Sequence, residues 1–359
     1  MKAFAITPGV PSSGRLRDAP EPLRSATQTL VEVIAVGVDG TDRELLSGAY
    51  GEAPPGEDYL ITGHESLGRV VTASDGSLRE GQLVVAIVRR PDPVPCANCA
   101  AGEWDMCLNG RYTERGIKGA HGFLAERYVE EPRYLVALPD ALLGVGMLLE
   151  PLSIVEKAIE QIDRIQSRLL WTPRRALVLG AGTIGTFAVL LLRLRGLEVM
   201  LYSRGEGGRG RELAEQAGAA FCRADSTKLD HSFAEQAGGI DIVIEASGYS
   251  PLAFEAIDVV GPNGIVCLTG VSAGSRSLTI DAAHLNLEMV LSNRLVFGTV
   301  NANRRHFENG VAHLQTIASG WPGLLERMIT RRVPLAQLDQ AALDHPEDLK
   351  VVVDVSPGA

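Results

Sequence analysis

Three short segments, far apart in the chain, carry residue types that bind a catalytic metal ion. Asp39 lies in a glycine-rich turn, His64 is followed directly by Glu65, and Glu150 precedes a proline. A catalytic zinc takes about three protein ligands and keeps a fourth position open for water or substrate. We expect Asp39, His64 and Glu150 to supply these ligands. Glu65 is either an exchangeable ligand or a carboxylate that supports the site from outside the coordination sphere.

A glycine-rich loop, Gly-Ala-Gly-Thr-Ile-Gly at 180–185, follows an apolar strand and opens a predicted helix. Gly180 permits the tight turn, Gly182 lets the backbone approach a pyrophosphate, and Gly185 lets helix and strand pack closely. The helix N-terminus offers free N–H groups to the phosphates. The alternative is a tight turn that binds nothing. A Lewis acid combined with a dinucleotide fold indicates hydride transfer to or from a hydroxyl-bearing substrate.

The residues after the next strand favour NADP over NAD. NAD sites usually place an Asp or Glu there for the ribose hydroxyls, whereas this chain has Ser203 and Arg204. Arg204 can bind a 2′-phosphate through charge-assisted hydrogen bonds. We expect NADP, with NAD as a second cofactor; the alternative is that Arg204 is a solvated surface charge. The residues expected to contact the cofactor are Gly180, Gly182, Thr183, Ile184, Gly185, Ser203, Arg204, Ala246, Ser247, Thr269, Val271 and Asn301.

Composition indicates an acidic, soluble globular protein. The chain has 359 residues, a formal net charge of −10 and 45% hydrophobic residues. That length suits roughly two domains, and the negative charge argues against general nucleic-acid binding. No apolar run approaches the roughly 18 residues that span a bilayer, and the first residues are typical of a strand rather than a signal peptide. Five cysteines, three of them clustered, indicate a reducing compartment, and we expect the cytoplasm.

The sequence pattern changes after Glu150 and predicts an α/β protein of two domains. Before it, the short β-branched segments 29–36, 67–73 and 83–88 predict a compact, barrel-like β domain. After residue 175, strands alternate with helices, which predicts a doubly wound parallel sheet of the Rossmann type. The tail returns to the first domain. We therefore expect a catalytic domain of residues 1–155 and 306–359 and a dinucleotide-binding domain of residues 156–305.

The chain resembles the zinc-dependent medium-chain dehydrogenase/reductase superfamily over essentially its whole length. The opening strand, Gly63-His64-Glu65, the cysteine cluster and the glycine-rich loop occur in the order found there. More narrowly, the chain is similar to the archaeal-type glucose dehydrogenase family. Superfamily members usually have Cys where Asp39 stands, but some glucose dehydrogenases have Asp, a hard oxygen ligand in place of a soft thiolate. The segments that carry the narrower match are 37–42, 89–90, 114–117, 121–122, 150–151 and 300–301.

The resemblance implies a mainly β, GroES-like catalytic domain and several substrate contacts. Thr41 matches a position whose hydroxyl hydrogen-bonds the reacting oxygen and starts proton release. Glu114 and Asn301 match positions that bind sugar hydroxyls, and Arg90 is a further candidate contact. A buried sugar needs such side chains because each of its hydroxyls requires a partner. The alternative for Glu114 is an ion pair at the surface with Arg111 or Arg115.

The cysteines Cys96, Cys99 and Cys107 resemble the structural-zinc lobe of the superfamily, which normally has four cysteines. Asp92 lies four residues before Cys96 and is the candidate fourth ligand. One oxygen with three thiolates is an unusual structural zinc site. The alternative is a lobe held by packing alone, with free thiols.

These features imply an NAD(P)-dependent zinc sugar dehydrogenase that passes hydride from C1 of a glucose-like aldose to the cofactor and forms a lactone. Ile154 stands where some glucose dehydrogenases have an acidic residue. The sequence therefore defines the identity of the sugar less closely than it defines the type of reaction. One alternative is a polyol, cyclitol or secondary-metabolite alcohol dehydrogenase with the same machinery. A second is a non-catalytic NADPH-binding protein. The strand at 295–299 can pair with a second copy at the sheet edge, and the resemblance implies a homodimer or homotetramer.

Overall fold

The chain folds into two compact units in this computed structural model, which describes residues 1–272, 277–339 and 347–356. The first unit contains Met1–Ser153, Asn301–Ser319 and Leu325–Ala359, and the second contains Ile154–Val300 and Gly320–Leu324. Residues 301–305, which we expected in the dinucleotide-binding domain, belong to the first unit. The reason is local hydrogen bonding: Asn303 Nδ2 donates to the Asp105 carboxylate at 2.9 Å and to the Gly102 carbonyl at 2.6 Å.

The main sheet of the first unit has seven strands. Their order is β11-β6-β5-β3-β19-β18, with β10 also paired to β3. Strand β3 is rich in valine and almost entirely buried, as suits the centre of a sheet. The C-terminal strand β19 runs antiparallel to β3 with Val351 opposite Val38. The bounds are β3 Thr29–Val38, β5 Glu65–Thr72, β6 Leu83–Ala86, β10 Arg127–Glu130, β11 Leu135–Leu138, β18 Ile329–Pro334 and β19 Lys350–Asp354.

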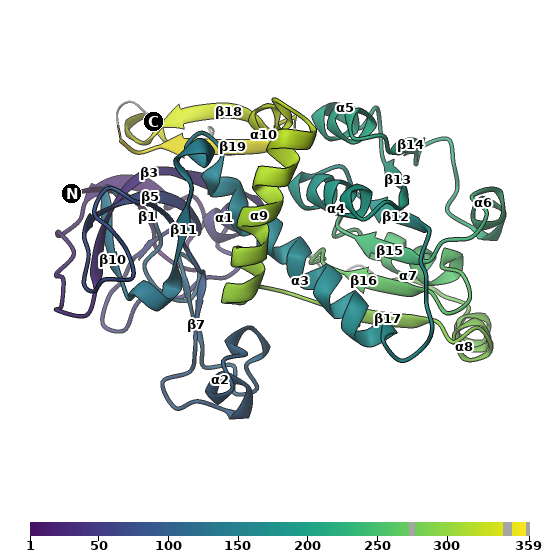
Figure 1. Ribbon diagram of the computed structural model, residues 1–359. Coiled ribbons are helices and arrows are strands. Elements are labelled where there is room, and N and C mark those ends of the chain that lie inside the picture. Colours follow the sequence, from purple (N-terminus) through teal and green to yellow (C-terminus); the bar gives the residue numbers. More distant parts are fainter. Residues whose placement is uncertain (273–276, 340–346, 357–359) are drawn as a thin grey trace. The chain divides into compact units, whose positions relative to one another are not determined.

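Two three-stranded sheets and several short helices complete the first unit (Figure 1). The sheets have the orders β2-β1-β4 and β7-β8-β9. Apolar side chains such as Phe4, Val33, Leu124 and Val353 form a shared core beneath them. The strands are β1 Lys2–Ile6, β2 Arg15–Asp18, β4 Leu60–Ile61, β7 Arg89–Arg90, β8 Thr113–Arg115 and β9 Gly119–Ala120. The helices are α1 Gly40–Leu46, α2 Ala97–Ala100, η1 Trp104–Met106, η2 Pro132–Tyr134, η3 Asp140–Leu142, η4 Gly146–Leu148, α9 Arg304–Gly320, α10 Leu324–Met328 and η5 Leu335–Gln337.

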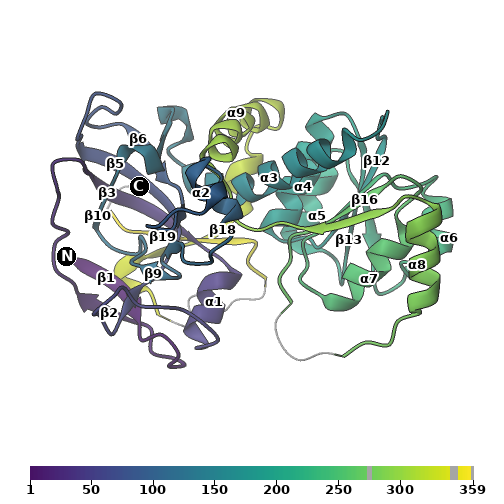
Figure 2. The same ribbon diagram turned by 90° about the horizontal axis from the view of Figure 1, so that it is seen from below.

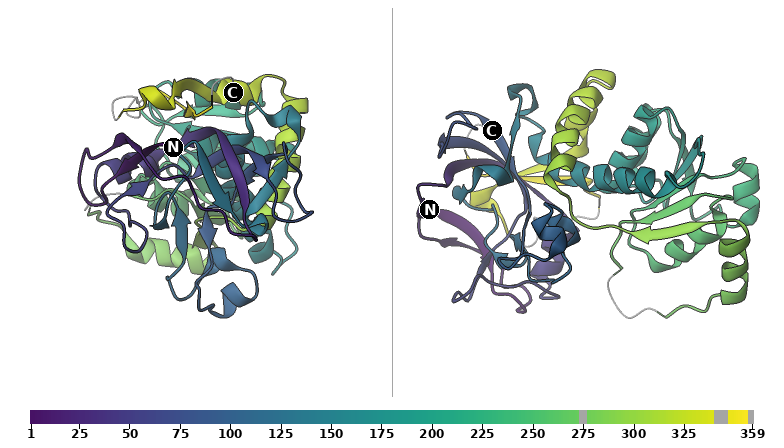
Figure 3. Two further views of the ribbon diagram at one scale, coloured as in Figure 1. Left: turned by 90° about the vertical axis from the view of Figure 1, so that its left-hand side faces the viewer. Right: turned by 60° about the horizontal axis from the view of Figure 1, so that its bottom comes forward.

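The second unit is a parallel sheet of six strands in the order β14-β13-β12-β15-β16-β17. Helices α4 and α5 pack together on one face, and α6, α7 and α8 cover the other, as Figure 2 shows. Figure 3, in its right panel, shows the same sheet with helices on both sides. The strands are β12 Arg175–Leu179, β13 Glu198–Ser203, β14 Ala220–Arg223, β15 Ile242–Glu245, β16 Ile265–Leu268 and β17 Leu295–Gly298. The helices are α4 Thr183–Leu194, α5 Gly208–Gln216, α6 His231–Gln236, α7 Ser250–Val259 and α8 Ala282–Leu291.

The strand order reverses between β12 and β15, and ligands bind at such a switch point, outside the carboxyl ends of the strands. The predicted fold class is confirmed in both of its parts. Helix α3 spans Leu149–Gln166. Glu150 therefore lies in the first turn of a helix. Among the described residues, no helix is both long enough and apolar enough to cross a membrane.

Candidate metal centre, cofactor site and substrate site

The sheet register brings the two halves of the predicted metal site together. Asp39 follows β3, and His64 and Glu65 lie at the start of its neighbour β5, where Glu65 is opposite Gly37. The ligand atoms of Asp39, His64 and Glu65 all lie within 4.8 Å of one another. His64 Nε2 lies 3.8 Å from Asp39 Oδ2. Antiparallel pairing thus places residues distant in sequence around one point.

The chemistry of this donor set fits a zinc ion. One imidazole and two carboxylates are typical zinc ligands, and a catalytic zinc takes about three of them with one open position. His64 is 5% exposed and Asp39 is partly exposed, so the group is buried but reachable. The described residues provide no hydrogen-bond partner for the buried His64 Nδ1, which faces Asp42 Oδ2 at 4.0 Å. An imidazole held in this way has its Nε2 directed toward the carboxylate of Asp39.

Glu150, another predicted ligand, is buried in the first unit. It is 6% exposed and interacts electrostatically with His64, Glu65 and Asp39, yet it lies outside the closest three-residue group. Burial, reinforced by the neighbouring carboxylates, raises its pKa to about 8. Of the two predicted glutamate ligands, Glu65 thus belongs to the group of three, and Glu150 lies outside it. The difference arises because Glu150 sits on α3, whereas Glu65 sits on the strand that carries His64.

Four acidic side chains surround His64 in this centre. Burial alone would lower the pKa of His64, but the carboxylates of Asp39, Glu150, Asp42 and Glu65 raise it to about 9. A buried cluster of carboxylates is costly unless cations compensate it. A divalent ion among these ligands would supply such compensation. The number of carboxylates and the types of donor atom are therefore both consistent with a divalent metal ion.

Lys350 is a component of the centre that sequence reasoning missed. Its ammonium donates to both carboxylate oxygens of Glu65, at 2.6 and 2.7 Å, and both side chains are 1% exposed. Burial would lower the pKa of Lys350, but Glu65 and Asp39 raise it, so the lysine stays charged. The only signal in the sequence was a lysine opening an otherwise apolar strand. Gly37 makes room for the pair, since a Cβ there would lie 1.9 Å from Glu65 Oε2.

Asp39 and Asp42 shape the loop that holds Thr41. Asp39 caps α1 by accepting from the Thr41 N–H at 2.7 Å, and the Asp39 N–H donates to Asp42 at 3.2 Å, which together form a capping box. Asp42 also accepts from the Gly63 N–H at 3.1 Å and so ties α1 to the residue before His64. The Thr41 hydroxyl lies 3.4 Å from Asp39 Oδ2. Asp42 is thus a structural support that we had not assigned.

The cofactor site is a cavity of about 450 Å³ in the second unit, at the carboxyl ends of β12, β13 and β15. Its walls include the predicted Gly180 and Gly182 of the loop. Gly180 has φ +107°, and Gly185 packs so closely that a Cβ would lie 1.9 Å from the Gly180 carbonyl. Both observations match the expected tasks of these glycines. The other predicted residues that line the cavity are Ser203, Arg204, Ala246 and Ser247.

Arg204 differs from the other arginines near this cavity. Arg209, Arg211 and Arg223 each form an ion pair with a carboxylate. Arg204 instead lies over the ring of Tyr249, with its guanidinium carbon 5.8 Å from the ring centroid. Among the described residues Arg204 forms no close ion pair, although its charge helps to lower the pKa of Asp225. Its guanidinium is therefore suited to an incoming phosphate.

The remaining predicted cofactor residues do not line the cavity. Thr183, Ile184 and Gly185 form the first turn of α4. The Thr269 hydroxyl donates to the Glu245 carbonyl at 2.7 Å, and Val271 is 74% exposed. Asn301 belongs to the first unit, where its Nδ2 donates to Glu114 Oε1 at 2.8 Å.

The predicted sugar contacts Glu114 and Asn301 meet, but Arg90 does not join them. Arg90 pairs with Glu130, donates to the Ile87 carbonyl at 2.6 Å and lies over Tyr134. Adjacent residues in a strand point to opposite faces, so β7 directs Arg90 away from Glu114. The guanidinium that reaches Glu114 belongs to Arg89, which we had not assigned.

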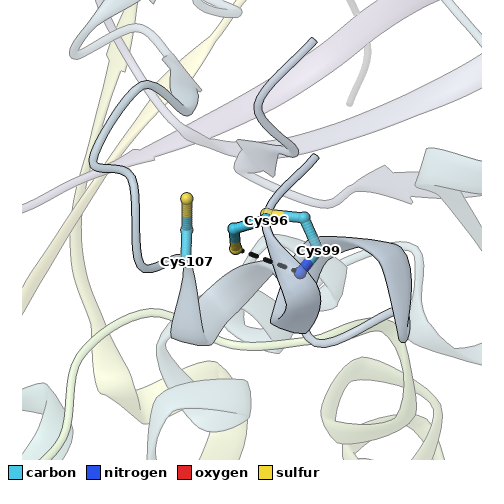
Figure 4. Close-up of side chains that lie close together, drawn as sticks. All are labelled: Cys96, Cys99 and Cys107. Atoms are coloured by element: carbon cyan, nitrogen blue, oxygen red, sulfur yellow. Dashed lines mark hydrogen bonds between the residues drawn. The ribbon is translucent and has the colours of Figure 1, made fainter. Parts of the chain in front are cut away.

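The three clustered cysteines converge as predicted. The sulfur atoms of Cys96, Cys99 and Cys107 lie within 4.8 Å of one another (Figure 4). Backbone N–H groups of Cys99 and Leu108 donate to the Cys96 sulfur and lower its pKa to about 6, which favours the thiolate. The described residues place only these three thiols in the group.

Asp92 does not complete this group. Its carboxylate accepts from the Val94 N–H at 2.8 Å, from Asn109 at 2.7 Å and from Arg111 at 3.1 Å. These three donors hold the carboxylate at the base of the loop and so account for its absence from the thiol group.

Comparison with known proteins agrees with this geometry. The family model described as "Glucose dehydrogenase C-terminus" matches residues 143–355, and the model described as "Alcohol dehydrogenase GroES-like domain" matches residues 25–140. The chain belongs to the glucose dehydrogenase family. The family resemblance inferred from the sequence is therefore confirmed.

Within the glucose dehydrogenase family, the relatives match along their whole length. A glucose 1-dehydrogenase from Methanocella arvoryzae is 48% identical over 99% of both chains, and one from Thermoproteus tenax is 40% identical over 99% of both. The structure of Haloferax mediterranei glucose dehydrogenase in complex with NADP, Zn and gluconolactone is 32% identical, covers 99% of both chains and has a TM-score of 0.91. That glucose dehydrogenase therefore shares the fold across both units.

Proposed function

We propose that this protein oxidises the anomeric hydroxyl of a glucose-like aldose to a lactone, with NADP as the preferred cofactor and NAD as a second one. The observation that carries the proposal is the convergence of Asp39, His64 and Glu65 in the unit that also joins Glu114 to Asn301. The relatives named glucose 1-dehydrogenase and the Haloferax mediterranei complex with NADP, Zn and gluconolactone support this assignment.

Asp39 and His64, together with Glu65 or Glu150, would hold the catalytic zinc. When bound, zinc supplies Lewis-acid polarisation of the substrate hydroxyl and lowers its pKa. The protein arranges the charges around that event in advance. Lys350 holds both carboxylate oxygens of Glu65 in place, and Asp42 fixes the loop that presents Thr41. Such preorganised charges contribute to the rate because they need no rearrangement during the reaction.

The substrate proton leaves through Thr41 in this proposal. Its hydroxyl, which lies 3.4 Å from Asp39 Oδ2 in the structure, accepts the proton of the reacting oxygen and passes its own proton outward to solvent. Glu114 accepts a hydrogen bond from a second sugar hydroxyl, and Asn301 holds that carboxylate from the side. The chain's own residues thus orient the aldose and receive its proton.

The second unit binds the cofactor through its backbone and one charge. Gly182 and the N-terminus of α4 receive the pyrophosphate, and Arg204 receives the 2′-phosphate. NADP, when bound, supplies the hydride acceptor. Ser203 ends β13 where NAD sites usually place an acidic residue, which supports the preference for NADP.

The function can be tested with a substrate screen that uses both cofactors before and after treatment with a chelator. We expect aldoses with NADP to react fastest, chelation to abolish the activity, and added zinc to restore it. Faster oxidation of polyols or cyclitols would favour an alcohol dehydrogenase of the same superfamily. Tight NADPH binding without turnover of any sugar or alcohol would contradict an enzymatic function.

We further propose that the three-cysteine lobe holds a second zinc ion and that the chain forms a homodimer or homotetramer in the cytoplasm. Three converging thiols, one of them with a lowered pKa, suit zinc, with the fourth position taken by a ligand outside these three cysteines.

The proposed assembly uses the edge of the six-stranded sheet. Strand β17 ends this sheet, and nearby on α8 Leu287, Val290 and Leu291 are 53%, 65% and 72% exposed. Pairing of this edge with a second copy would cover both; light scattering measures the assembly.

A further inference from the structure

We propose that Arg89 is a positioning residue for the sugar site, acting through Glu114. This inference rests on the proposed function, because it concerns how that site recognises a sugar hydroxyl. The sequence places two arginines side by side, and only the sheet register distinguishes them. On the antiparallel pair β7–β8, Arg89 is directly opposite Glu114, and Arg90 is opposite Thr113. Directly opposed side chains on one face contact each other.

The contact between Arg89 and Glu114 is close and largely buried. Arg89 Nε and one of its terminal nitrogens both donate to Glu114 Oε1, at 3.1 and 2.9 Å. Asn301 Nδ2 donates to the same oxygen at 2.8 Å. The Arg89 and Glu114 side chains are 5% and 13% exposed. Three donors therefore converge on one carboxylate oxygen in a setting where charged hydrogen bonds are strong.

The second oxygen of Glu114 is the one left for a ligand. Among the described residues, none donates a hydrogen bond to Oε2. An ionised carboxylate can accept on both oxygens, so the saturation of Oε1 directs Oε2 toward an incoming hydroxyl. Without Arg89, Glu114 would keep its hydrogen bond from Asn301. It would lose the positive charge of the guanidinium and two of the three hydrogen bonds to Oε1. The carboxylate would then be less well oriented.

Arg89 is itself held rigidly, as a positioning residue must be. Its other terminal nitrogen donates to the Asp105 carbonyl at 3.0 Å, and its guanidinium carbon lies 3.7 Å from the centroid of the Tyr112 ring. Asp105 belongs to the turn between Cys99 and Cys107, and Figure 1 shows β7 leading toward this lobe, where α2 lies. A lysine could keep the charge but could not make three directed bonds to two partners in this geometry.

The backbone connects this carboxylate to the metal centre. Gly116, two residues after Glu114, packs against Gly63, the residue before His64. A Cβ on Gly116 would lie 2.6 Å from the Gly63 carbonyl oxygen, and Gly116 has φ +78°. Because the two backbones are in close contact, the position of strand β8, which carries Glu114, is fixed relative to His64. Arg89 then needs only to set the orientation of the carboxylate.

A double-mutant cycle between Arg89 and Glu114 tests the inference. The variants are Arg89→Lys, Glu114→Gln and the double variant, each assayed for kcat and KM with glucose and with its monodeoxy analogues. We expect Arg89→Lys to lower kcat/KM for glucose roughly 10- to 100-fold, because small displacements of a binding group have effects of this size. In the Glu114→Gln background the same change should cost less than about threefold, since interacting groups are strongly non-additive.

The ratio of kcat/KM for glucose to kcat/KM for each deoxy sugar would not change through a general structural defect. The unmodified protein should discriminate against the analogue that lacks the hydroxyl bound by Glu114, and Arg89→Lys should lose that discrimination selectively. Arg90→Lys is the matched control: it lies on the opposite side of β7 and should leave kcat/KM within about twofold. Melting temperature and NADPH affinity are measured for every variant. If Arg89→Lys does not fold, Arg89→Gln is taken through the same cycle.

The experiment distinguishes failure of the Arg89 inference from failure of the proposed function. Multiplicative losses in the double variant, or equal slowing of glucose and all deoxy sugars, would overturn the role of Arg89 while leaving the proposed function intact. Inactivity of the unmodified protein on every sugar would instead contradict the proposed function.

Discussion

Lys350 donates to both carboxylate oxygens of Glu65, at 2.6 and 2.7 Å, across 285 positions of sequence. The pair lies at the end of the central sheet, where β19 runs beside β3 and β3 beside β5. It therefore joins the C-terminal strand to the proposed metal centre. A buried ion pair of this kind is costly to break because one unpaired charge remains.

Replacing Lys350 by methionine should destabilise the first unit by roughly 3–5 kcal/mol, the usual cost of removing one partner of a buried pair. The reason is that Glu65 would stay buried without its counter-charge. Denaturant unfolding measures the change. The double variant Lys350→Met with Glu65→Gln should recover much of the loss, because both charges are then gone. An equally unstable double variant would show that the pair is not the cause.

Reversing the charge at Arg204 should change the cofactor preference. Charged hydrogen bonds contribute about 1.5–3 kcal/mol, so Arg204→Glu should lower kcat/KM for NADP by roughly 10- to 150-fold and change that for NAD little. Arg209→Glu is the matched control, since Arg209 already pairs with Glu212 at 2.6 Å. Equal discrimination in Arg204→Glu and the unmodified protein would remove Arg204 from the cofactor site.

Metal content should distinguish the two proposed zinc sites. We expect about two zinc ions per chain, because one cluster offers Asp39, His64 and Glu65 and the other offers three thiols. His64→Ala should lose one ion together with activity. Cys107→Ser should lose the other ion. Elemental analysis of the purified proteins checks both. About one zinc per chain, unchanged in Cys107→Ser, would mean that the cysteine lobe is held by packing alone.

Removing the Thr41 hydroxyl should slow turnover without weakening the fold. General acid–base groups typically contribute 10²–10⁴-fold, so Thr41→Ala should lower kcat by about 100-fold or more. Thr41→Ser keeps the hydroxyl and should retain most of the activity. Steady-state kinetics decides between the two. Similar rates for the alanine and serine variants would argue against a proton path through this residue.

The stability of the first unit should depend on pH through Glu130. Burial opposes ionisation of Glu130, but Arg90 and Arg115 outweigh it and hold its pKa below 4.5. A carboxyl with a lowered folded-state pKa contributes stability that is fully present above its ordinary pKa and is lost as the pH falls through the folded-state value. Glu130→Gln should therefore destabilise the protein at pH 7 and do so progressively less below about pH 4.5. Thermal unfolding across this range tests it, and a constant difference would contradict the assignment.

Local sequence patterns were sufficient to predict several features of this structure. The glycines at 180, 182 and 185 specify a strand–turn–helix whose geometry depends on near neighbours, so the cofactor loop could be read directly from the sequence. The spacing of Cys96, Cys99 and Cys107 likewise predicted converging thiols. Alternation of strands and helices predicted the parallel sheet. In each case the determining contacts lie within a few residues, or within one repeating pattern.

Other parts depend on which strands become neighbours. Nothing near Lys350 indicates Glu65, and only the pairing of β19 with β3 and of β3 with β5 brings them together. The register of β7 on β8 selected Arg89 over Arg90, because a strand sends consecutive side chains to opposite faces. The sequence limits the residue types available for the chemistry, whereas long-range register selects the pairs that meet. Register is a property of the assembled sheet, since shifting it by one residue would exchange every inward side chain for an outward one.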